Sequence, residues 1–137
     1  MKRWQRSLVS VAGLVGVALG AEGIAGVQRV GAVTRENFIA RTTADYVAVC
    51  STPESDPIYQ AAMAFCHGYG VGAFHYYLAV IEAQGKKPFV CLPNPTPPRQ
   101  EILQGFVAWA GSHPAHVQEL PVEALFRYLV EKFPCPK

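Results

Sequence analysis

Residues 56–85 read DPIYQAAMAFCHGYGVGAFHYYLAVIEAQG and contain the longest helical pattern of this chain. Asp56 offers a side-chain acceptor at a helix N-terminus, and Pro57 has the fixed φ suited to a first helical position. Gly85 suits the left-handed conformation that ends many helices. The pattern therefore predicts a helix over residues 57–84. The apolar residues at helical spacing, which form its expected buried face, are Ile58, Ala62, Phe65, Tyr69, Gly72 and Tyr76.

One shorter helix is predicted on each side of this segment. Apolar residues at steps of three and four follow Thr34, a candidate N-cap, and continue to Val49. The third helix in chain order, after the long one, is expected over residues 97–112, with Thr96 as its cap and Pro97 in its first turn.

The last helix has the clearest amphipathic pattern of the chain. It begins at Pro121 and ends before Pro134, because proline is favoured in a first turn and excluded from a helix interior. Its outer face carries Glu123, Arg127 and Glu131 at steps of four, which favours weak ion pairs along the helix. Its expected apolar face comprises Val122, Leu125, Phe126, Leu129, Val130 and Phe133.

These helices define the expected fold class. The segment between the second and third helices, residues 86–98, is rich in proline and is predicted to be an ordered or extended loop. No repeat, low-complexity tract or linker divides the chain. We therefore predict an all-α protein, a small bundle of about four helices that forms a single domain over residues 34–137.

The first 21 residues have the three parts of a secretory signal peptide. Three basic residues precede an apolar stretch over residues 8–21, which ends in small residues. That stretch is shorter than the roughly 18 residues needed to cross a bilayer. We expect cleavage after Gly20 or Ala21, a short N-terminal extension over residues 22–33, and no stable membrane anchor after cleavage. Cleavage after Ala25 and an uncleaved anchor are the alternatives. The mature protein is expected to be periplasmic or secreted.

Four cysteines follow the predicted signal peptide, and in an exported protein they predict two disulfides. We favour Cys50–Cys66 with Cys91–Cys135, since in each pair the chain can return along an antiparallel helix. The pairings of Cys50 with Cys91 and Cys66 with Cys135, or of Cys50 with Cys135 and Cys66 with Cys91, remain open. The favoured cross-links would stabilise the fold by about 3 and about 4 kcal/mol in the chain-entropy model.

Composition excludes several classes of protein. Half of the residues are hydrophobic and 16% are charged, which is not the composition of a disordered chain. The formal net charge of +2 includes the three basic residues of the predicted signal peptide. Without them, nine basic residues face ten acidic ones, a net charge of −1. Because a phosphate backbone requires clustered basic residues, we expect no nucleic-acid partner.

No group of residues forms a catalytic or metal-binding motif. Adjacent Cys66 and His67 point about 100° apart on a helix, so they cannot act as a nucleophile and its base. His67 and His75 are separated by about 12 Å of helix rise. His113 and His116 have HxxH spacing but straddle a proline, and two ligands do not make a zinc site. The sequence therefore predicts no enzymatic activity, no metal and no cofactor.

The long helical segment contains glycines that a helix does not favour. Gly68, Gly70 and Gly72 each cost a helix about 1 kcal/mol relative to alanine. A sequence that keeps three such glycines in a helix is expected to need close approach of another backbone there. We expect Gly68, Tyr69 and Gly72 to pack against a helix of the same chain, with a second subunit as the alternative.

Three segments together form a pattern of cysteines, glycines and prolines. They are Phe65-Cys66-His67-Gly68-Tyr69 with Gly72, Val90-Cys91-Leu92-Pro93, and His113-Pro114 with Leu125 leading to Phe133-Pro134-Cys135. Together they resemble the Rap/Tai family of immunity proteins over residues 65–135. Members of that family are small, exported, all-helical and often dimeric, and they block peptidoglycan amidase toxins delivered by type VI secretion. The resemblance implies a toxin partner and homodimer formation.

The main functional hypothesis is an exported protein that neutralises a peptidoglycan amidase by covering its active site with a helix-loop surface. Four consecutive bulky residues from Phe74 to Tyr77 cannot all face one core, so some are expected in an interface. The candidate contact residues are Phe74, His75, Tyr76, Tyr77, Asn94 and Arg99. The alternative function is a periplasmic chaperone or an envelope stress or structural subunit of the same fold.

Overall fold

The computed structural model describes residues 32–136. It contains no β-strand in this range, only an isolated antiparallel bridge between Val90 and Pro134. The predicted all-α bundle of four helices is confirmed. The predicted signal peptide and residues 22–31 lie outside the described residues. In chain order the elements are the 3-10 helix η1 (Asn37–Ile39), α1 (Thr43–Cys50), α2 (Tyr59–Ala83), α3 (Arg99–Ser112), the 3-10 helix η2 (Pro114–His116) and α4 (Pro121–Lys132).

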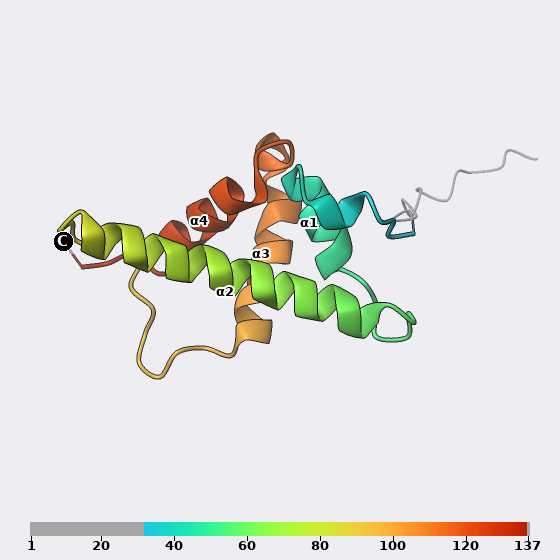
Figure 1. Ribbon diagram of the computed structural model, residues 1–137, viewed down its shortest axis with the longest axis horizontal. Helices are drawn as coiled ribbons and strands as arrows, with labels where there is room; N and C mark the ends of the chain where they lie inside the picture. Colours follow the sequence, from blue (N-terminus) through green and yellow to red (C-terminus); the bar gives the residue numbers. More distant parts are fainter. Residues whose placement is uncertain (1–31, 137) are drawn as a thin grey trace, which may run out of the picture.

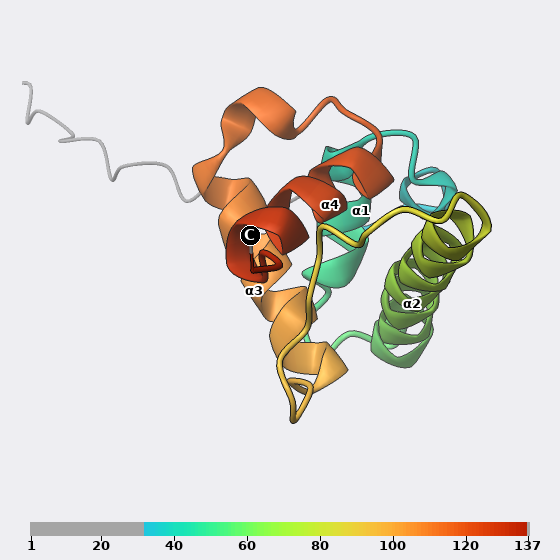
Figure 2. The ribbon, with the colours of Figure 1, turned by 90° about the vertical axis from the view of Figure 1, so that its left-hand side faces the viewer.

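Helix α2 lies along one side of the molecule, and α1, α3 and α4 are grouped against one face of it (Figure 1). The loop between α2 and α3 crosses from the end of α2 toward α4 before it turns back to α3 (Figure 2). Within residues 32–136, no helix combines the length and the apolar character needed to cross a bilayer.

The long predicted helix is confirmed, but it begins two residues later than expected. The Asp56 carboxylate accepts a hydrogen bond from the Ile58 N–H at 3.0 Å, so it shapes the turn before the helix instead of capping the first turn. Gly85 has the predicted left-handed conformation, with φ of 59°. Its N–H and that of the next residue donate to carbonyls in the last turn, which forms a Schellman motif. The predicted helix stop is therefore confirmed.

The buried face of α2 differs from the predicted one. Ala62, Met63, Cys66 and Tyr77 are buried, whereas the Tyr76 side chain is 73% exposed. Apolar residues occur all around this helix, so spacing alone could not identify which side would meet the other helices. The actual side is the one that carries the disulfide.

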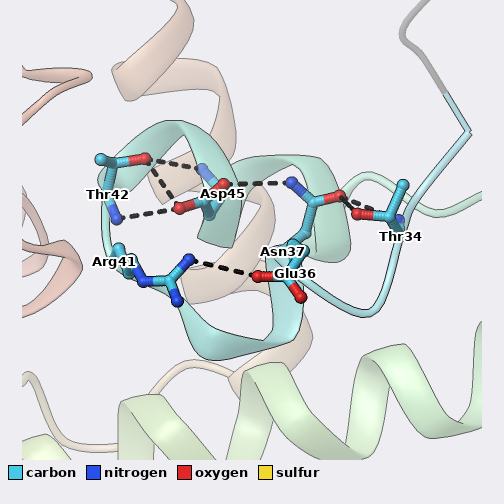
Figure 3. A network of polar contacts seen from close by, with 6 residues as sticks. All are labelled: Thr34, Glu36, Asn37, Arg41, Thr42 and Asp45. Atoms are coloured by element: carbon cyan, nitrogen blue, oxygen red, sulfur yellow. Dashed lines mark hydrogen bonds and ion pairs between the residues drawn. The ribbon is translucent and has the colours of Figure 1, made fainter.

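Helix α1 is shorter than predicted because its cap is Thr42 and not Thr34 (Figure 3). Thr42 and Asp45 form a capping box, in which each backbone N–H donates to the other side chain at 3.2 and 3.1 Å. Thr34 instead donates to the Asn37 side chain, whose amide donates to Asp45 at 3.1 Å. The left-handed residue Ala40 separates η1 from α1.

Helix α3 begins at Arg99 and not at Pro97, and no side chain caps it, so Thr96 is not its cap. Pro97 precedes Pro98, and a residue before proline avoids the helical region of φ/ψ space. Pro98 itself is extended, with ψ of 142°. The helix therefore starts only after the last proline.

Helix α4 begins at Pro121 as predicted, but its buried face is rotated from the expected one. Ala124 and Tyr128 are buried, and Val130 is 40% exposed. The ring of Tyr128 packs against Phe106 of α3 with centroids 6.0 Å apart. This aromatic contact turns the helix toward α3.

The charged residues of α4 pair with other elements and not with one another at steps of four. Arg127 Nε donates to the Glu119 carboxylate at 2.8 Å, and Glu131 accepts a hydrogen bond from the indole of Trp109 at 2.8 Å. His116 Nδ1 donates to Glu119 at 2.9 Å. The Glu119 carbonyl also accepts the N–H of the first residue of α1 at 2.8 Å. Glu119 therefore connects α1, η2 and α4.

Both favoured disulfides are confirmed. Cys50–Cys66 joins the last residue of α1 to the first half of α2, with Cα atoms 5.8 Å apart. Cys91–Cys135 ties the proline-rich loop to the segment after α4, with Cα atoms 4.8 Å apart. The Cys91 N–H also donates to the carbonyl of Phe133 at 2.9 Å.

Tyr46 lies at the centre of the core and is 1% exposed. Its ring contacts Phe65 and Tyr69 of α2 and Phe106 of α3, with centroid distances of 6.2, 4.8 and 5.8 Å. Its hydroxyl donates to the Cys66 carbonyl at 2.7 Å. Burial raises the pKa of this hydroxyl, so it stays protonated and can donate.

Replacing Tyr46 with phenylalanine should lower the free energy of unfolding by about 1 kcal/mol. The loss is modest because the Cys66 carbonyl lies inside α2 and keeps its helical partner. Urea unfolding measures the change. Tyr76→Phe, at an exposed tyrosine, is the control and should change stability by less than about 0.5 kcal/mol. Equal effects of the two substitutions would contradict a stabilising role for the buried hydrogen bond.

Acid should destabilise the fold through Glu119 and Asp45. Hydrogen bonds from Arg127 and His116 lower the pKa of Glu119. Burial alone would raise the pKa of Asp45, but the hydrogen bonds of the capping network outweigh burial and lower that pKa. Both folded-state values lie below the unfolded ones, about 4.3 for Glu and 3.9 for Asp. The carboxylates therefore add stability at neutral pH that is lost as the pH falls through their folded pKa.

Urea midpoints measured at decreasing pH test this expectation. The wild-type midpoint should decrease below about pH 5. Glu119→Gln should show a shallower decrease, since glutamine does not titrate. Glu54→Gln, at an exposed residue outside this network, should follow the wild type. A Glu119→Gln curve parallel to that of the wild type would exclude Glu119 as a source of the acid sensitivity.

Candidate functional site

A partly open groove of about 270 Å³ lies between α2 and α3 and reaches α4 and the proline-rich loop. We call it the central groove. Its form, a concave apolar surface with a few polar groups, is typical of binding sites. The apolar residues that line it are Val71 and Phe74 of α2, Leu92 and Pro97 of the loop, Ile102 and Leu103 of α3, and Leu125 and Leu129 of α4.

The bottom of the central groove is part of the protein core. Tyr46, Leu103, Leu125 and Leu129 line it, and each of these side chains is less than 10% exposed. They come from α1, α3 and α4, so the groove extends from the surface of α2 to the centre of the bundle.

The loop that forms one wall of the groove is fixed at several points. The Tyr77 hydroxyl accepts hydrogen bonds from the N–H groups of Phe89 and Val90 at 2.7 and 3.2 Å. The next residue, Cys91, is covalently bound to Cys135. The groove therefore has a preformed wall.

Polar side chains at the groove are basic or neutral. His67 Nε2 of α2 donates to Gln100 Oε1 of α3 at 3.0 Å, which links the two helices beside the groove. His75 and Arg99 also line it, and no aspartate or glutamate does. None of the ion pairs formed within residues 32–136 includes Arg99, which is exposed.

The structure brings together three of the six predicted contact residues. Phe74, His75 and Arg99 line the central groove. Asn94 is exposed on the proline-rich loop, and Tyr76 points to solvent outside the groove lining. Tyr77 is only 8% exposed and holds the loop, so its assignment as a contact residue is wrong.

The glycines of α2 do not pack as expected. Gly68 and Gly72 are exposed, and a Cβ atom at either would meet nothing within 4 Å, so packing of these two against a helix of the same chain is wrong. A second subunit as their partner stays a prediction. Tyr69 does pack, against Tyr46. Close packing does require glycine at Gly105 of α3, where a Cβ atom would overlap the Tyr128 hydroxyl and crowd its ring.

The histidine pair near η2 is part of an aromatic stack. His113 and His116 stack on Trp109 with centroid distances of 4.3 and 5.7 Å. Within residues 32–136, no three His, Cys, Asp or Glu residues are grouped so that they could hold a metal ion.

Comparison with known proteins identifies the family. The family model of Rap1a immunity proteins matches residues 42–135, from the residue that caps α1 to the last cysteine of the second disulfide. The chain belongs to the Rap1a immunity protein family. Neither the curated proteins nor the solved structures contain a match. Membership of the Rap1a family indicates a toxin-neutralising immunity protein, and such a role implies an inhibitor and not an enzyme.

The open surroundings of Gly72 lead to a stability prediction. Gly72→Ala should raise the free energy of unfolding by about 0.5 to 1 kcal/mol, because alanine favours a helix and meets no neighbour here. Gly105→Ala is the matched comparison, and it should lower stability, since its Cβ would displace the buried Tyr128 ring. Thermal unfolding distinguishes the two. Destabilisation by Gly72→Ala would show that this position is crowded.

Proposed function

We propose that this Rap1a-family protein neutralises a peptidoglycan amidase toxin, delivered by type VI secretion, by binding over the toxin's active site. The observation that carries the proposal is the family match across α1 to α4 and both disulfides. Toxin and inhibitor would meet in the periplasm. The predicted signal peptide and the two disulfides support that compartment, since disulfides form and persist in oxidising environments.

The rim of the central groove is our candidate contact surface. It combines Arg99 and His75 of the groove lining with Asn94 of the loop, and the strongly exposed Tyr76 lies next to His75 on α2. Tyrosine and arginine are enriched among the residues that contribute most to protein interfaces. Because the loop is held by Tyr77 and Cys91, little ordering is required on binding.

A homodimer is part of the same proposal. Gly68 and Gly72 leave an open strip along the exposed side of α2, where a second copy could approach the helix closely. The molecular mass of the purified protein, measured by light scattering with and without toxin, tests this part separately.

The test of the main proposal begins with the purified product of the neighbouring gene, captured with the tagged, oxidised protein and assayed for peptidoglycan amidase activity. The purified protein should bind that enzyme at a fixed ratio and stop its release of peptidoglycan fragments. Tyr76→Ala should weaken inhibition about tenfold without changing the thermal midpoint, as expected for loss of a central interface residue. Ile39→Ala, at an exposed apolar residue outside the groove, is the control and should inhibit like the wild type.

Two outcomes would contradict the proposal. Undiminished amidase activity in the presence of the protein would exclude this partner. Full inhibition by both variants would retain the toxin partner but exclude Tyr76 from the contact surface.

A further inference from the structure

We infer that the central groove binds a small amphiphile with an apolar chain and an anionic head, of the class of medium-chain carboxylates. This inference does not depend on the toxin. It rests on the size of the groove, on its apolar depth and on the charge of its mouth.

The size of the groove limits the length of the chain. An apolar cavity of about 150 Å³ holds a benzene molecule. The central groove, at about 270 Å³, therefore has room for about ten carbon atoms. Its bottom is formed by Leu103, Leu125 and Leu129, so a chain of this length would be surrounded by aliphatic side chains from two helices.

The charge of the mouth selects the head group. Arg99 and the two histidines His67 and His75 are the ionisable side chains at the groove apart from the buried tyrosine at its bottom. The lining contains no carboxylate that could neutralise a cation, and Arg99 takes part in none of the ion pairs of residues 32–136. A guanidinium binds a carboxylate through two parallel hydrogen bonds, which fits a head group placed at the start of α3.

The depth of the groove favours a free ligand over a protein side chain. The lining reaches Tyr46, Leu125 and Leu129, which belong to the core that holds α1 and α4 together. A chain anchored at Arg99 can extend to this level, whereas a residue on a toxin surface must also bring its backbone to the mouth. The wall formed by the disulfide-bonded loop is already in place, as in most small-molecule sites.

A chain-length series tests the inference directly. Calorimetric titration of the oxidised protein with hexanoate, octanoate, decanoate and dodecanoate, below their micelle concentrations, should give an affinity that rises about fourfold per methylene. The rise should stop beyond about ten carbons, where the groove is full. Decyltrimethylammonium, with the same chain and a positive head, should bind roughly tenfold more weakly than decanoate or worse.

Two variants assign the binding to this groove. Arg99→Gln should reduce decanoate affinity by about three- to tenfold, the range between an exposed ion pair and a charge-assisted hydrogen bond. Arg35→Gln removes the same charge from an exposed arginine outside the groove and should have no effect. Val71→Trp should fill the groove and abolish binding. Circular dichroism shows whether the Val71→Trp variant is folded. If it is not, the comparison of Arg99→Gln with Arg35→Gln decides the assignment.

Several outcomes would overturn the inference. No binding of decanoate at millimolar concentration would do so, as would equal affinity for the ammonium amphiphile or equal effects of Arg99→Gln and Arg35→Gln. If the wild-type protein does not bind decanoate and a folded Val71→Trp variant loses toxin inhibition, the groove receives a toxin side chain instead. Failure to inhibit the amidase, with decanoate binding intact, would contradict only the proposed immunity function.

Discussion

The buried ring of Tyr46 packs α1 against α2 and α3, and the arrangement of the bundle depends on this packing. Its hydroxyl adds a hydrogen bond to the Cys66 carbonyl of α2. A helix of eight residues is not stable alone in water, so α1 needs tertiary contacts. Its buried tyrosine supplies them to α2 and α3 at once, and the disulfide Cys50–Cys66 closes the same junction one turn later. Because Tyr46 also lines the bottom of the central groove, the residue that fixes the fold also shapes the candidate site.

The second constraint acts on the proline-rich loop. A segment of this length without regular structure is usually mobile. Here its first half is held by the Tyr77 hydroxyl, by the bridge between Val90 and Pro134, and by the disulfide to Cys135. The conformational entropy of the loop is therefore lost during folding and not during binding, which increases the affinity that any contact along the loop can provide.

Sequence reasoning succeeded where local chemistry decides the structure. Gly85 marks the end of α2 because few residues other than glycine adopt a positive φ. Pro121 marks the start of α4 because its fixed φ and missing N–H suit a first helical turn. Both were predicted correctly. Thr34 and Thr96 are not caps, because a threonine is compatible with many kinds of turn. The capping box of Thr42 starts α1 instead of Thr34. Pro97 before Pro98 keeps α3 from starting after Thr96. The buried side of α2 and the central groove could not be predicted, since both result from the packing of five segments that are distant in sequence.

The stability that the two disulfides supply explains how α2 can keep its exposed glycines. Gly68 and Gly72 each weaken the helix by about 1 kcal/mol, and nothing within residues 32–136 approaches them closely enough to require glycine. Two disulfides that stabilise by about 3 and about 4 kcal/mol exceed that loss. The cross-links thus allow the outer side of α2 to keep residues that do not favour the isolated fold. A surface that is retained at the expense of stability is expected where a protein acts by binding, which agrees with the proposal that a second copy approaches α2 along Gly68 and Gly72.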